Sequence, residues 1–391
     1  MKNKVKIIHA IRQGKIGGGE SHVLELVSHL DPERFESIVL SFTTGPMVEE
    51  LERRGIRTQV FETETPFDIK VWRQVAAFLR REKPQMVHAH GTRAMSNLVF
   101  PARWANIPLV YTVHGWSFHN DQSALVRKIR VASERFLTRR AVQTICVSAS
   151  NQEEGIRRFN LQNSRVIHNA IDLEKFDYRR QFPDLRPSLG ISQGKTVVGF
   201  IARVTEQKDP FTLIRAMKRV RDETRDVVLL MVGDGNLREK TIQLARDLGI
   251  TDQVVFQGFR TDVPQVLSAI DIYCLPSLWE GFPIGILEAM AMEIPVIASS
   301  IDANREMVED GILGLLVNQG EEKKLAEAIL LLHRDRRLRA SLAQAARKLV
   351  CQRHGIEDLV LSVEDVYREL LRERTNPAAA PESMAYAAEA G

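Results

Sequence analysis

The sequence of 391 residues is about twice the length of a typical domain, so it predicts two domains that each bury a core. With 44% hydrophobic and 27% charged residues, and no run of roughly 20 apolar residues, it excludes wholesale disorder and a membrane-spanning helix. Residues 1–180 hold 28 Lys and Arg against 19 Asp and Glu, a net charge of +9, whereas the remainder carries −5, so we expect the first half to face an anionic partner.

Short β-rich runs alternate with amphipathic stretches of helical length along most of the chain. In the first half the expected strands cover residues 5–9, 37–41, 59–61, 86–90, 109–112, 143–147 and 164–167. A charged, proline-containing stretch at 172–192 interrupts this alternation, and we expect the domain boundary there. The alternation then resumes, with strands expected at residues 197–201, 227–232, 254–256, 272–274, 295–298 and 315–317.

Strands that alternate with helices favour parallel sheets, because a chain reaches a parallel neighbour only by crossing back over a face of the sheet. The sequence therefore predicts an α/β fold with two doubly wound, Rossmann-like domains, at residues 1–180 and 190–355. Such sheets bind ligands beyond the carboxyl ends of their strands, so we expect the domains to face each other across one cleft. A last helix at 356–374 should pack back on the N-terminal domain, and the Ala- and Pro-rich residues 375–391 should form a disordered tail.

Two loops of the first domain carry candidate site residues. Gly17 and Gly18 follow the first strand and open a helix, so their bare backbone could approach a phosphate closely, although tight packing also explains such glycines. His114 follows the fifth strand and should stand at the mouth of the cleft, although a lone histidine is more often a hydrogen-bonded structural residue. His88 and His90 end the preceding strand, and the sequence assigns them no role.

The helix expected within residues 123–140 is basic and amphipathic. One face carries Leu125, Ile129, Ala132 and Phe136, and six cations lie mostly elsewhere, namely Arg127, Lys128, Arg130, Arg135, Arg139 and Arg140. Such a helix could rest on an anionic membrane surface and admit a lipid-linked acceptor, or it could pack on the core with a solvated basic back. We expect no nucleic-acid partner, because no aromatic interleaving or known binding motif accompanies the charge.

In the second domain, Arg203 and Lys208 follow the first strand. The planar fork of an arginine and the point charge of a lysine together suit a diphosphate, whereas a solvated surface position is the alternative for either residue alone. Gly233 and Gly235 follow the next strand, but the third glycine of a dinucleotide-binding fingerprint would fall at Arg238, so that fingerprint fails.

The segment at 275–288, Leu-Pro-Ser-Leu-Trp-Glu-Gly-Phe-Pro-Ile-Gly-Ile-Leu-Glu, leaves a strand and enters a helix near Ile284. The unpaired N–H groups and partial positive charge of a helix start suit a phosphate or the hydroxyl oxygens of a sugar. Glu280 precedes this helix and Glu288 lies about one turn inside it, so both carboxylates could accept hydrogen bonds from sugar hydroxyls. Stabilisation of the helix start is the alternative role for each glutamate.

Glu280, seven intervening residues and Glu288, followed by Ala-Met-Ala and the strand Ile-Pro-Val-Ile-Ala, resemble the signature of the GT4 family of retaining glycosyltransferases. The resemblance covers roughly residues 1–370 and implies the GT-B fold, which has two Rossmann-like domains. It also implies that Glu288 holds the ribose hydroxyls of the nucleotide. The donor sugar and its phosphates would then be held by Glu280 and by the backbone of Phe282, Pro283, Ile284 and Gly285.

The same resemblance gives roles to the other loops. It implies that Arg203 and Lys208 stabilise the departing nucleoside diphosphate, and that His114 contacts the donor sugar and the reaction centre. Gly233 would lie near the nucleotide. Phe259, after the strand that flanks the base, could contact the base or pack in the core.

The chain departs from the family pattern at Asp302-Ala-Asn-Arg-Glu306, where many relatives have Gly-Gly-x-Pro-Glu, so the contacts of this loop with the donor should differ. Neither Asp-x-Asp nor His-Glu-x-x-His occurs, so we expect no metal and no other cofactor, and positive charge at the diphosphate should come from side chains and helix ends. Cys146, Cys274 and Cys351 form no Cys-x-x-Cys pair and should be buried free thiols.

The predicted activity is the transfer of a hexose-type sugar, with retention of anomeric configuration, from a UDP- or GDP-sugar to a glycan or a polyprenyl- or other lipid-linked acceptor, as in polysaccharide or lipopolysaccharide biosynthesis. Domain closure would exclude water and favour transfer over hydrolysis. A nucleotide-sugar epimerase of the same fold and a catalytically silent binding protein are the alternatives. We expect a cytoplasmic protein, or one at the inner face of the membrane, because residues 5–11 are too short and broken for a signal-peptide core.

Overall fold

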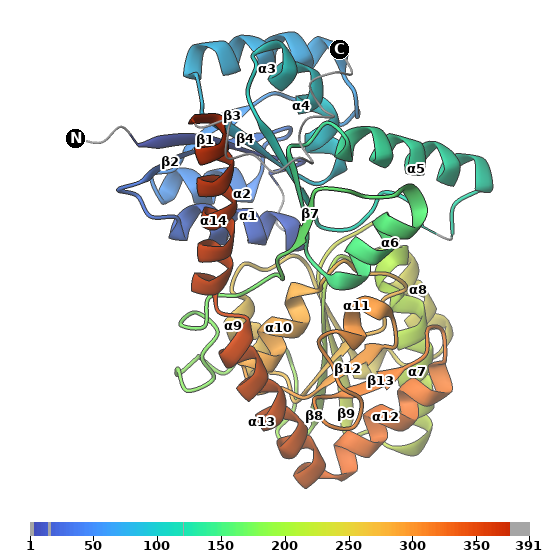
Figure 1. Cartoon of the computed structure of the whole chain (residues 1–391). Helices are drawn as coiled ribbons and strands as arrows, with labels where there is room; N and C mark the ends of the chain where they lie inside the picture. The colour runs from blue at the N-terminus through green and yellow to red at the C-terminus, as the bar shows by residue number, and fades with distance from the viewer. Residues whose placement is uncertain (1–3, 15–16, 120, 376–391) are drawn as a thin grey trace. The chain divides into compact units, whose positions relative to one another are not determined.

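The computed structural model describes residues 4–14, 17–119 and 121–375, and the chain divides into two compact units (Figure 1). The first unit comprises residues 1–169 and 356–391, and the second comprises residues 170–355. The division falls at residue 169, earlier than the limit of 180 that the sequence suggests. Residues 376–391 of the expected tail lie outside the described residues.

The first unit is built on a seven-stranded sheet. Its strands, in the order in which they lie side by side, are β3 (Arg57–Val60), β2 (Phe35–Ser41), β1 (Val5–Ile11), β4 (Met86–His90), β5 (Leu109–Val113), β6 (Gln143–Cys146) and β7 (Ser164–Val166). Every pairing in this sheet is parallel, as the alternation of strands and helices predicts.

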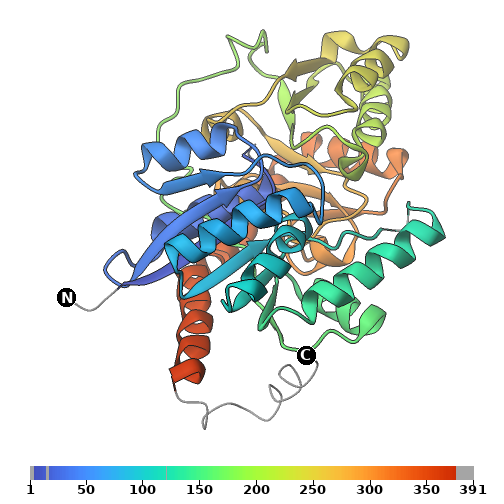
Figure 2. The ribbon, with the colours of Figure 1, turned by 90° about the horizontal axis from the view of Figure 1, so that it is seen from above.

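Helices lie on both faces of this sheet (Figure 2). They are α1 (Gly18–His29), α2 (Pro46–Arg53), α3 (Ile69–Glu82), α4 (Thr92–Trp104), α5 (Ala124–Thr138), α6 (Ala149–Phe159) and α14 (Ile356–Thr375). The local sequence determines where several of them begin. Asp68 caps α3 by accepting a hydrogen bond from the backbone of Lys70, and Ser123 and Ser148 cap α5 and α6 in a similar way.

Helix α14 returns from near the end of the sequence to the first unit. Its Tyr367 is fully buried, and the Tyr367 hydroxyl lies 2.6 Å from Nδ1 of His88 in β4. The backbone N–H of Asp31 donates to the Glu364 carboxylate at 3.2 Å. This helix is therefore an integral part of the N-terminal unit, although the whole second unit separates it in sequence.

The second unit has a six-stranded parallel sheet, in the order β10 (Val254–Gln257), β9 (Val227–Val232), β8 (Thr196–Ile201), β11 (Ile272–Leu275), β12 (Val296–Ser299) and β13 (Leu315–Val317). All six residues of β9 are buried, as a strand covered on both faces requires. The helical elements are η1 (Glu206–Lys208), α7 (Pro210–Glu223), α8 (Arg238–Asp247), η2 (Thr251–Gln253), α9 (Val263–Ser268), α10 (Ile284–Ala291), α11 (Asp302–Arg305), α12 (Glu322–Arg334) and α13 (Arg336–Arg353).

Both sheets are wound in the same way. The chain begins in the middle of each sheet, adds strands on one side, and then returns to add strands on the other side, so the direction of winding reverses between β1 and β4 and between β8 and β11. Ligands of open parallel sheets bind at this reversal, beyond the carboxyl ends of the strands. We therefore expect a ligand site in the loops after these four strands.

Among the helices of the described ranges, none is long and apolar enough to cross a membrane. Cys146 and Cys274 are buried, as expected, but the expectation for Cys351 is wrong, because this residue is exposed near the end of α13. Val350 occupies the neighbouring buried position of that helix, which leaves Cys351 facing solvent.

Candidate active site

The loops after β8 and β11 meet through a buried ion pair. Lys208 lies in η1, and its ammonium contacts the carboxylate of Glu280. Ser277 Oγ donates to the same carboxylate at 2.6 Å, and Gln207 Nε2 approaches it at 3.3 Å. The side chains of Lys208 and Glu280 are only 15% and 6% exposed. Desolvation offsets much of the attraction in such a pair, so its contribution to stability alone does not explain it.

Backbone contacts align the same two loops. The N–H of Leu278 donates to the carbonyl of Gln207 at 2.8 Å, and Gln207 Nε2 donates to the carbonyl of Trp279 at 2.9 Å. Gln207 therefore holds both the backbone and the carboxylate of the segment that contains Glu280. As a result, the position of the Lys208 ammonium is fixed by protein groups rather than by solvent.

Helix α10 begins at Ile284, as the sequence predicts, with Pro283 as its N-cap residue. No described side chain caps this helix, so the N–H groups of its first residues have no side-chain partner and remain available to a ligand. The side chains of Phe282 and Ile284 are buried, so a ligand here would meet only their backbone. The backbone role of this segment in donor binding stays a prediction.

Gly285 is required by the packing beneath this helix start. A Cβ at this position would collide with the hydroxyl of Tyr273, which donates to the carbonyl of Ile201 at 3.2 Å. Burial, followed by the negative charges of Glu288 and Glu280, raises the pKa of Tyr273 well above its ordinary value. Tyr273 is therefore a neutral hydrogen-bond donor that joins the end of β8 to the first turn of α10.

The two predicted phosphate-binding cations, Lys208 and Arg203, differ in whether a carboxylate already pairs with them. Lys208 already has a carboxylate partner in Glu280. Arg203, two residues beyond β8, is exposed, and its guanidinium makes no hydrogen bond or ion pair with the rest of the described chain. Its five N–H donors thus remain available to an anion.

Gly233 and Gly235 let the loop after β9 lie directly against the loop after β8. A Cβ on Gly233 would collide with the carbonyl oxygen of Ala202, and a Cβ on Gly235 with that of Val204. Gly233 also has a φ of +139°, which other residues rarely adopt. Packing between these two loops is therefore enough to explain why residue 233, which the sequence places near the nucleotide, is a glycine.

Phe259 lies on the surface, with 45% of its area exposed. Its backbone N–H donates to Asp234 Oδ2 at 2.8 Å, which ties its loop to the loop after β9. The exposure rules out packing in the core, the alternative that the sequence left open. The ring is instead accessible to a planar ligand such as a base.

At the carboxyl end of the first sheet, Gly17 is the N-cap residue of α1 and Gly18 is its first residue. No side chain caps this helix either. Apart from its chain neighbours and the backbone of its own helix, no atom of the described residues lies within 4 Å of the position that a Cβ on Gly18 would take. The absence of a side chain at Gly18 is therefore not explained by packing, and the space beside it suits a ligand.

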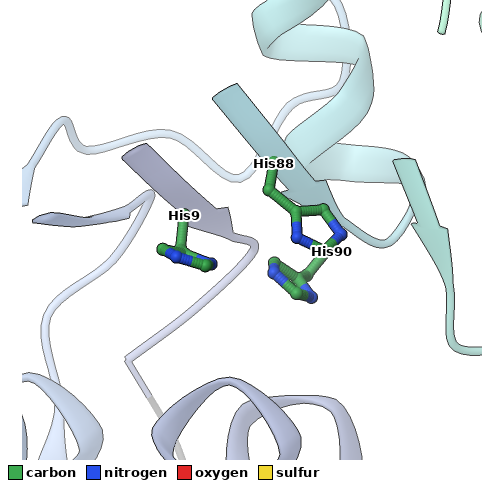
Figure 3. Close-up of side chains that lie close together, drawn as sticks. All are labelled: His9, His88 and His90. Carbon is green, nitrogen blue, oxygen red and sulfur yellow. The ribbon is translucent and has the colours of Figure 1, made fainter. Parts of the chain in front are cut away.

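His114 is not a lone histidine but part of a layer of five. His9 in β1 and His88 and His90 in β4 form the centre of this layer (Figure 3). His22 of α1 and His114, just beyond β5, complete it, with ring centroids 4.8 Å apart. Nε2 of His114 lies 3.4 Å from Nδ1 of His90.

Burial lowers the pKa of every imidazole in this layer, because a buried charge loses its hydration. The pKa of His22 falls to about 4 and that of His9 to about 3. The pKa values of His88, His90 and His114 lie well below their ordinary value for the same reason, and repulsion between the rings adds to the effect. The layer is therefore neutral at physiological pH, and His114 can offer a ligand a lone pair or an N–H group but not a positive charge.

The sequence did not identify three residues of this site, Tyr273, Gln207 and Ser277, as functional. Only the contacts described above show that they position Glu280 and the start of α10. Part of the histidine layer could have been predicted from the sequence, because His88 and His90 are two residues apart in a strand and so share a face of the sheet.

The N-terminal half of α5 exposes apolar side chains. Leu125, Val126 and Ile129 are 70%, 40% and 60% exposed, so this part of the helix does not pack on the core. Leu137, near the end of the helix, is fully buried and attaches it to the core of the first unit. The exposed apolar residues lie among the predicted cations of the same helix, most of which are exposed as well.

Two family models match consecutive parts of the chain. The model described as Glycosyltransferase Family 4 matches residues 16–175, which include most of the first unit. The model described as Glycosyl transferases group 1 matches residues 181–349, within the second unit. Both regions that hold the predicted site residues are thus covered.

Known proteins resemble the chain over most of its length. The UDP-Gal:alpha-D-GlcNAc-diphosphoundecaprenol alpha-1,3-galactosyltransferase of Escherichia coli is 26% identical over 380 residues, which cover 94% of this chain and 98% of that protein. The N-acetyl-alpha-D-glucosaminyl L-malate synthase of Bacillus anthracis is 26% identical over 316 residues, or 80% of this chain and 81% of that protein. Among solved structures, Anabaena HepE in complex with UDP and glucose has a TM-score of 0.84 at 25% identity, and the match covers 93% of this chain and 99% of HepE.

Proposed function

Because the chain belongs to the group 1 glycosyltransferases with the GT-B fold, we propose that it transfers a hexose-type sugar from a UDP-sugar with retention of anomeric configuration. The structures of HepE with UDP and with UDP-glucose support a UDP-sugar donor. Retention is proposed from the family signature around Glu280 and Glu288. The observation that carries the proposal is the buried Lys208–Glu280 pair, set close in sequence to the uncapped start of α10.

We assign donor binding to the second unit. The exposed Arg203 and the first N–H groups of α10 would bind the diphosphate, because both supply unpaired donors. Glu288 would accept hydrogen bonds from the ribose hydroxyls, and the exposed ring of Phe259 would contact the base. His114 and the backbone at Gly18 would contact the donor as neutral groups of the first unit.

The departing nucleoside diphosphate gains negative charge as the glycosidic bond breaks, so fixed cations near it stabilise the transition state more than the ground state. Lys208 meets this requirement because Glu280, which Gln207 contacts in turn, holds it before substrate arrives. The carboxylate of Glu280 already accepts hydrogen bonds from protein donors, so its main role would be to position Lys208, with remaining capacity for a sugar hydroxyl. A front-face route, in which the leaving phosphate takes the acceptor proton, would account for retention.

We also propose that transfer needs no metal or other cofactor, since Arg203, Lys208 and the start of α10 supply positive charge at the diphosphate. Turnover should then be unchanged in the presence of EDTA. Full loss of activity in EDTA, restored by Mg²⁺ or Mn²⁺, would contradict this part of the proposal.

The site assignment is tested with Lys208→Ala and Glu288→Ala, measured by consumption of UDP-glucose with a cell-extract acceptor. Removing one group that stabilises transition-state charge typically lowers kcat by about 10²–10³-fold, and we expect a loss of this order for Lys208→Ala. Glu288→Ala should mainly raise the KM for the donor. Lys218→Ala is the matched control, because Lys218 also pairs with a carboxylate, that of Asp222, but on the exposed surface of α7. If all three variants behave alike, the assignment is wrong.

We propose a glycan or lipid-linked acceptor, bound by the first unit with α5 resting on an anionic membrane surface at the cytoplasmic side. The exposed Leu125 and Ile129, the six cations of this helix and the net charge of +9 over residues 1–180 support this proposal. The E. coli relative, whose name specifies a diphosphoundecaprenol-linked substrate, supports it further.

Nucleotide and sugar preference can be measured by thermal shift with UDP-glucose, UDP-galactose, UDP-N-acetylglucosamine and GDP-mannose. A ligand at 100 times its Kd stabilises the folded protein by about 2.7 kcal/mol, so the preferred donor should give the largest rise in Tm. We expect at least one UDP-sugar to exceed GDP-mannose. The opposite order would overturn the UDP assignment while leaving the glycosyltransferase family intact.

A further inference from the structure

The segment at 302–306, where the chain departs from the family pattern, begins a series of buried hydrogen bonds. Asn304 lies in α11 with none of its area exposed, and its Nδ2 donates to the backbone carbonyl of Ser299 at 2.7 Å. A carbonyl can only accept, so this contact fixes which way the Asn304 amide is turned. Nδ2 also donates to the Ser299 hydroxyl at 3.2 Å. The Ser299 hydroxyl therefore accepts from Asn304 and keeps its own proton for another partner.

That partner belongs to the segment that holds Glu280. Ser299 is the last residue of β12, and its Oγ donates to the backbone carbonyl of Ser277. Both serines are buried, and Ser277 Oγ donates in turn to the Glu280 carboxylate at 2.6 Å. The same carboxylate pairs with Lys208. Contacts between buried polar groups therefore run without a break from Asn304 to the Lys208 ammonium.

These contacts brace the loop after β11 from the side of β12. In the order of the sheet, β11 lies between β8 and β12. Gln207, in the loop after β8, contacts the Glu280 carboxylate and the backbone of the same segment from the other side. Glu280 is therefore held through both neighbouring strands, and its position depends on Ser299 as well as on Gln207.

We propose that Ser299 and Asn304 are positioning residues for sugar transfer, because they hold Ser277, and through it the Glu280 carboxylate that fixes Lys208. This inference rests on the function proposed above for Lys208. Both positioning residues are buried, so they act through the pair and not by touching the donor. Asn304 stands at the third position of the segment, which the family pattern Gly-Gly-x-Pro-Glu leaves open.

The first test is kinetic, with UDP-glucose as the donor. A misplacement of about 1 Å in a reacting group can lower a rate by about 100-fold, so Ser299→Ala and Asn304→Leu should each lower kcat by about 10–100-fold. The KM for the donor should change much less, because Lys208 is proposed to act on charge that develops only in the transition state.

Thr241→Val is the matched control for these variants. Thr241 is also fully buried in the second unit, and its hydroxyl donates to the backbone carbonyl of Leu237 at 2.8 Å, outside this series of contacts. It should keep the wild-type kcat. If Thr241→Val loses as much activity as Ser299→Ala, the loss reflects any missing buried hydroxyl and the proposal is wrong.

A double-mutant cycle separates positioning from a general defect in folding. In a Lys208→Ala background, Ser299→Ala should have little further effect, because the group that it positions is already absent. A general defect would instead lower kcat by the same factor in both backgrounds, and this result would overturn the proposal. Circular dichroism and Tm establish that each variant is folded, and Asn304→Leu takes the place of Ser299→Ala in the cycle if the latter does not fold.

A second measurement needs neither donor nor acceptor. The Lys208 side chain is 15% exposed and paired with Glu280, so its amine should be acetylated slowly in the folded wild type. Ser299→Ala should raise its acetylation several-fold, measured by peptide mass spectrometry relative to Lys218, which pairs with Asp222 on the surface. Equal labelling of Lys208 in the wild type and in both variants would show that Ser299 and Asn304 do not position the pair. Raised labelling together with full activity of Lys208→Ala would instead confirm the positioning and refute the function proposed for Lys208.

Discussion

Gly18 at the start of α1 and Gly285 at the start of α10 differ in whether packing explains the absence of a side chain. Gly285 cannot carry a Cβ because the hydroxyl of Tyr273 occupies that space, whereas at Gly18 no described residue beyond its chain neighbours and its own helix backbone does so. An alanine at each position therefore separates the needs of packing from the needs of a ligand. The comparison is direct because both residues lie in the first turn of a helix that no side chain caps.

Gly18→Ala should leave the Tm unchanged or slightly raised, because alanine favours a helix by up to about 1 kcal/mol over glycine. The same variant should bind UDP-glucose several-fold more weakly, since the added methyl group enters the space proposed for the donor. Gly285→Ala should instead lower the Tm in the absence of ligand. Thermal shift with and without UDP-glucose measures both effects, and wild-type affinity in Gly18→Ala would remove this residue from the donor site.

The buried histidines should make stability depend on pH. In the unfolded chain these rings bind protons below about pH 6.5, whereas in the folded chain His22 does so only near pH 4 and His9 near pH 3. Stability is therefore full above pH 6.5 and falls as the pH decreases toward these values, because the unfolded state gains protons first. Each such ring should lower the free energy of unfolding by up to about 1.4 kcal/mol per pH unit in that window.

Urea denaturation between pH 7.5 and pH 5 measures this slope. His9→Gln removes one titrating ring and should give a shallower slope than the wild type. Equal slopes in the two proteins would show that His9 does not carry the expected share of the effect.

At the scale of secondary structure, the sequence predicted every strand of both sheets. For the central strands the reason is that a parallel strand buried on both faces needs a continuous apolar run, such as Val227–Val232. It also predicted the start of α10 at Ile284. Helix starts with a proline as the cap or first residue are among the clearest local signals.

The contacts that build the candidate site could not be predicted in this way. Lys208 and Glu280 are 72 positions apart, as are Ile201 and Tyr273, and no local pattern states that their loops meet. The histidine layer depends on the register in which His9 lies opposite His88, and a single sequence does not fix the register between neighbouring strands. The motif residues could thus be found from the sequence, but the groups that position them could not.

The exposed apolar side chains of α5 predict that the protein binds to anionic membranes through this helix. Exchange of Leu125 and Ile129 for Gln should weaken binding to phosphatidylglycerol vesicles by at least tenfold, because burial of each apolar side chain contributes about 1.5–3 kcal/mol. Cosedimentation measures this, and wild-type binding should fall with added salt and with phosphatidylcholine vesicles. Leu331→Gln, which changes an exposed leucine on α12, is the control. Unchanged binding in the double variant would mean that α5 does not hold the protein to lipid.

At the scale of the whole molecule, the first unit is discontinuous and the second is continuous. A chain that stops after Gly355 lacks α14 and all its buried apolar side chains, among them Leu359, Val363, Val366 and Tyr367. At about 1.5–3 kcal/mol each, their loss is comparable to the 5–15 kcal/mol that stabilises a typical domain.

Limited proteolysis of this truncated chain should therefore degrade residues 1–169 rapidly and leave a resistant fragment within residues 170–355. The full-length protein under the same conditions should protect both units. Equal protection in the two proteins would show that α14 is not needed to fold the first unit.

The position of α14 also determines the order in which the chain can be completed on the ribosome. The N-terminal sheet is synthesised first, but the partners of His88 and Asp31, Tyr367 and Glu364, are synthesised only after the whole second unit. The second unit is continuous in sequence, so it can fold as soon as Gly355 has emerged from the ribosome. The first unit is thus the first to be synthesised and the last to be completed. During that delay its incomplete apolar core is exposed to aggregation. We therefore expect the nascent chain to need chaperones most while residues 170–355 are being translated.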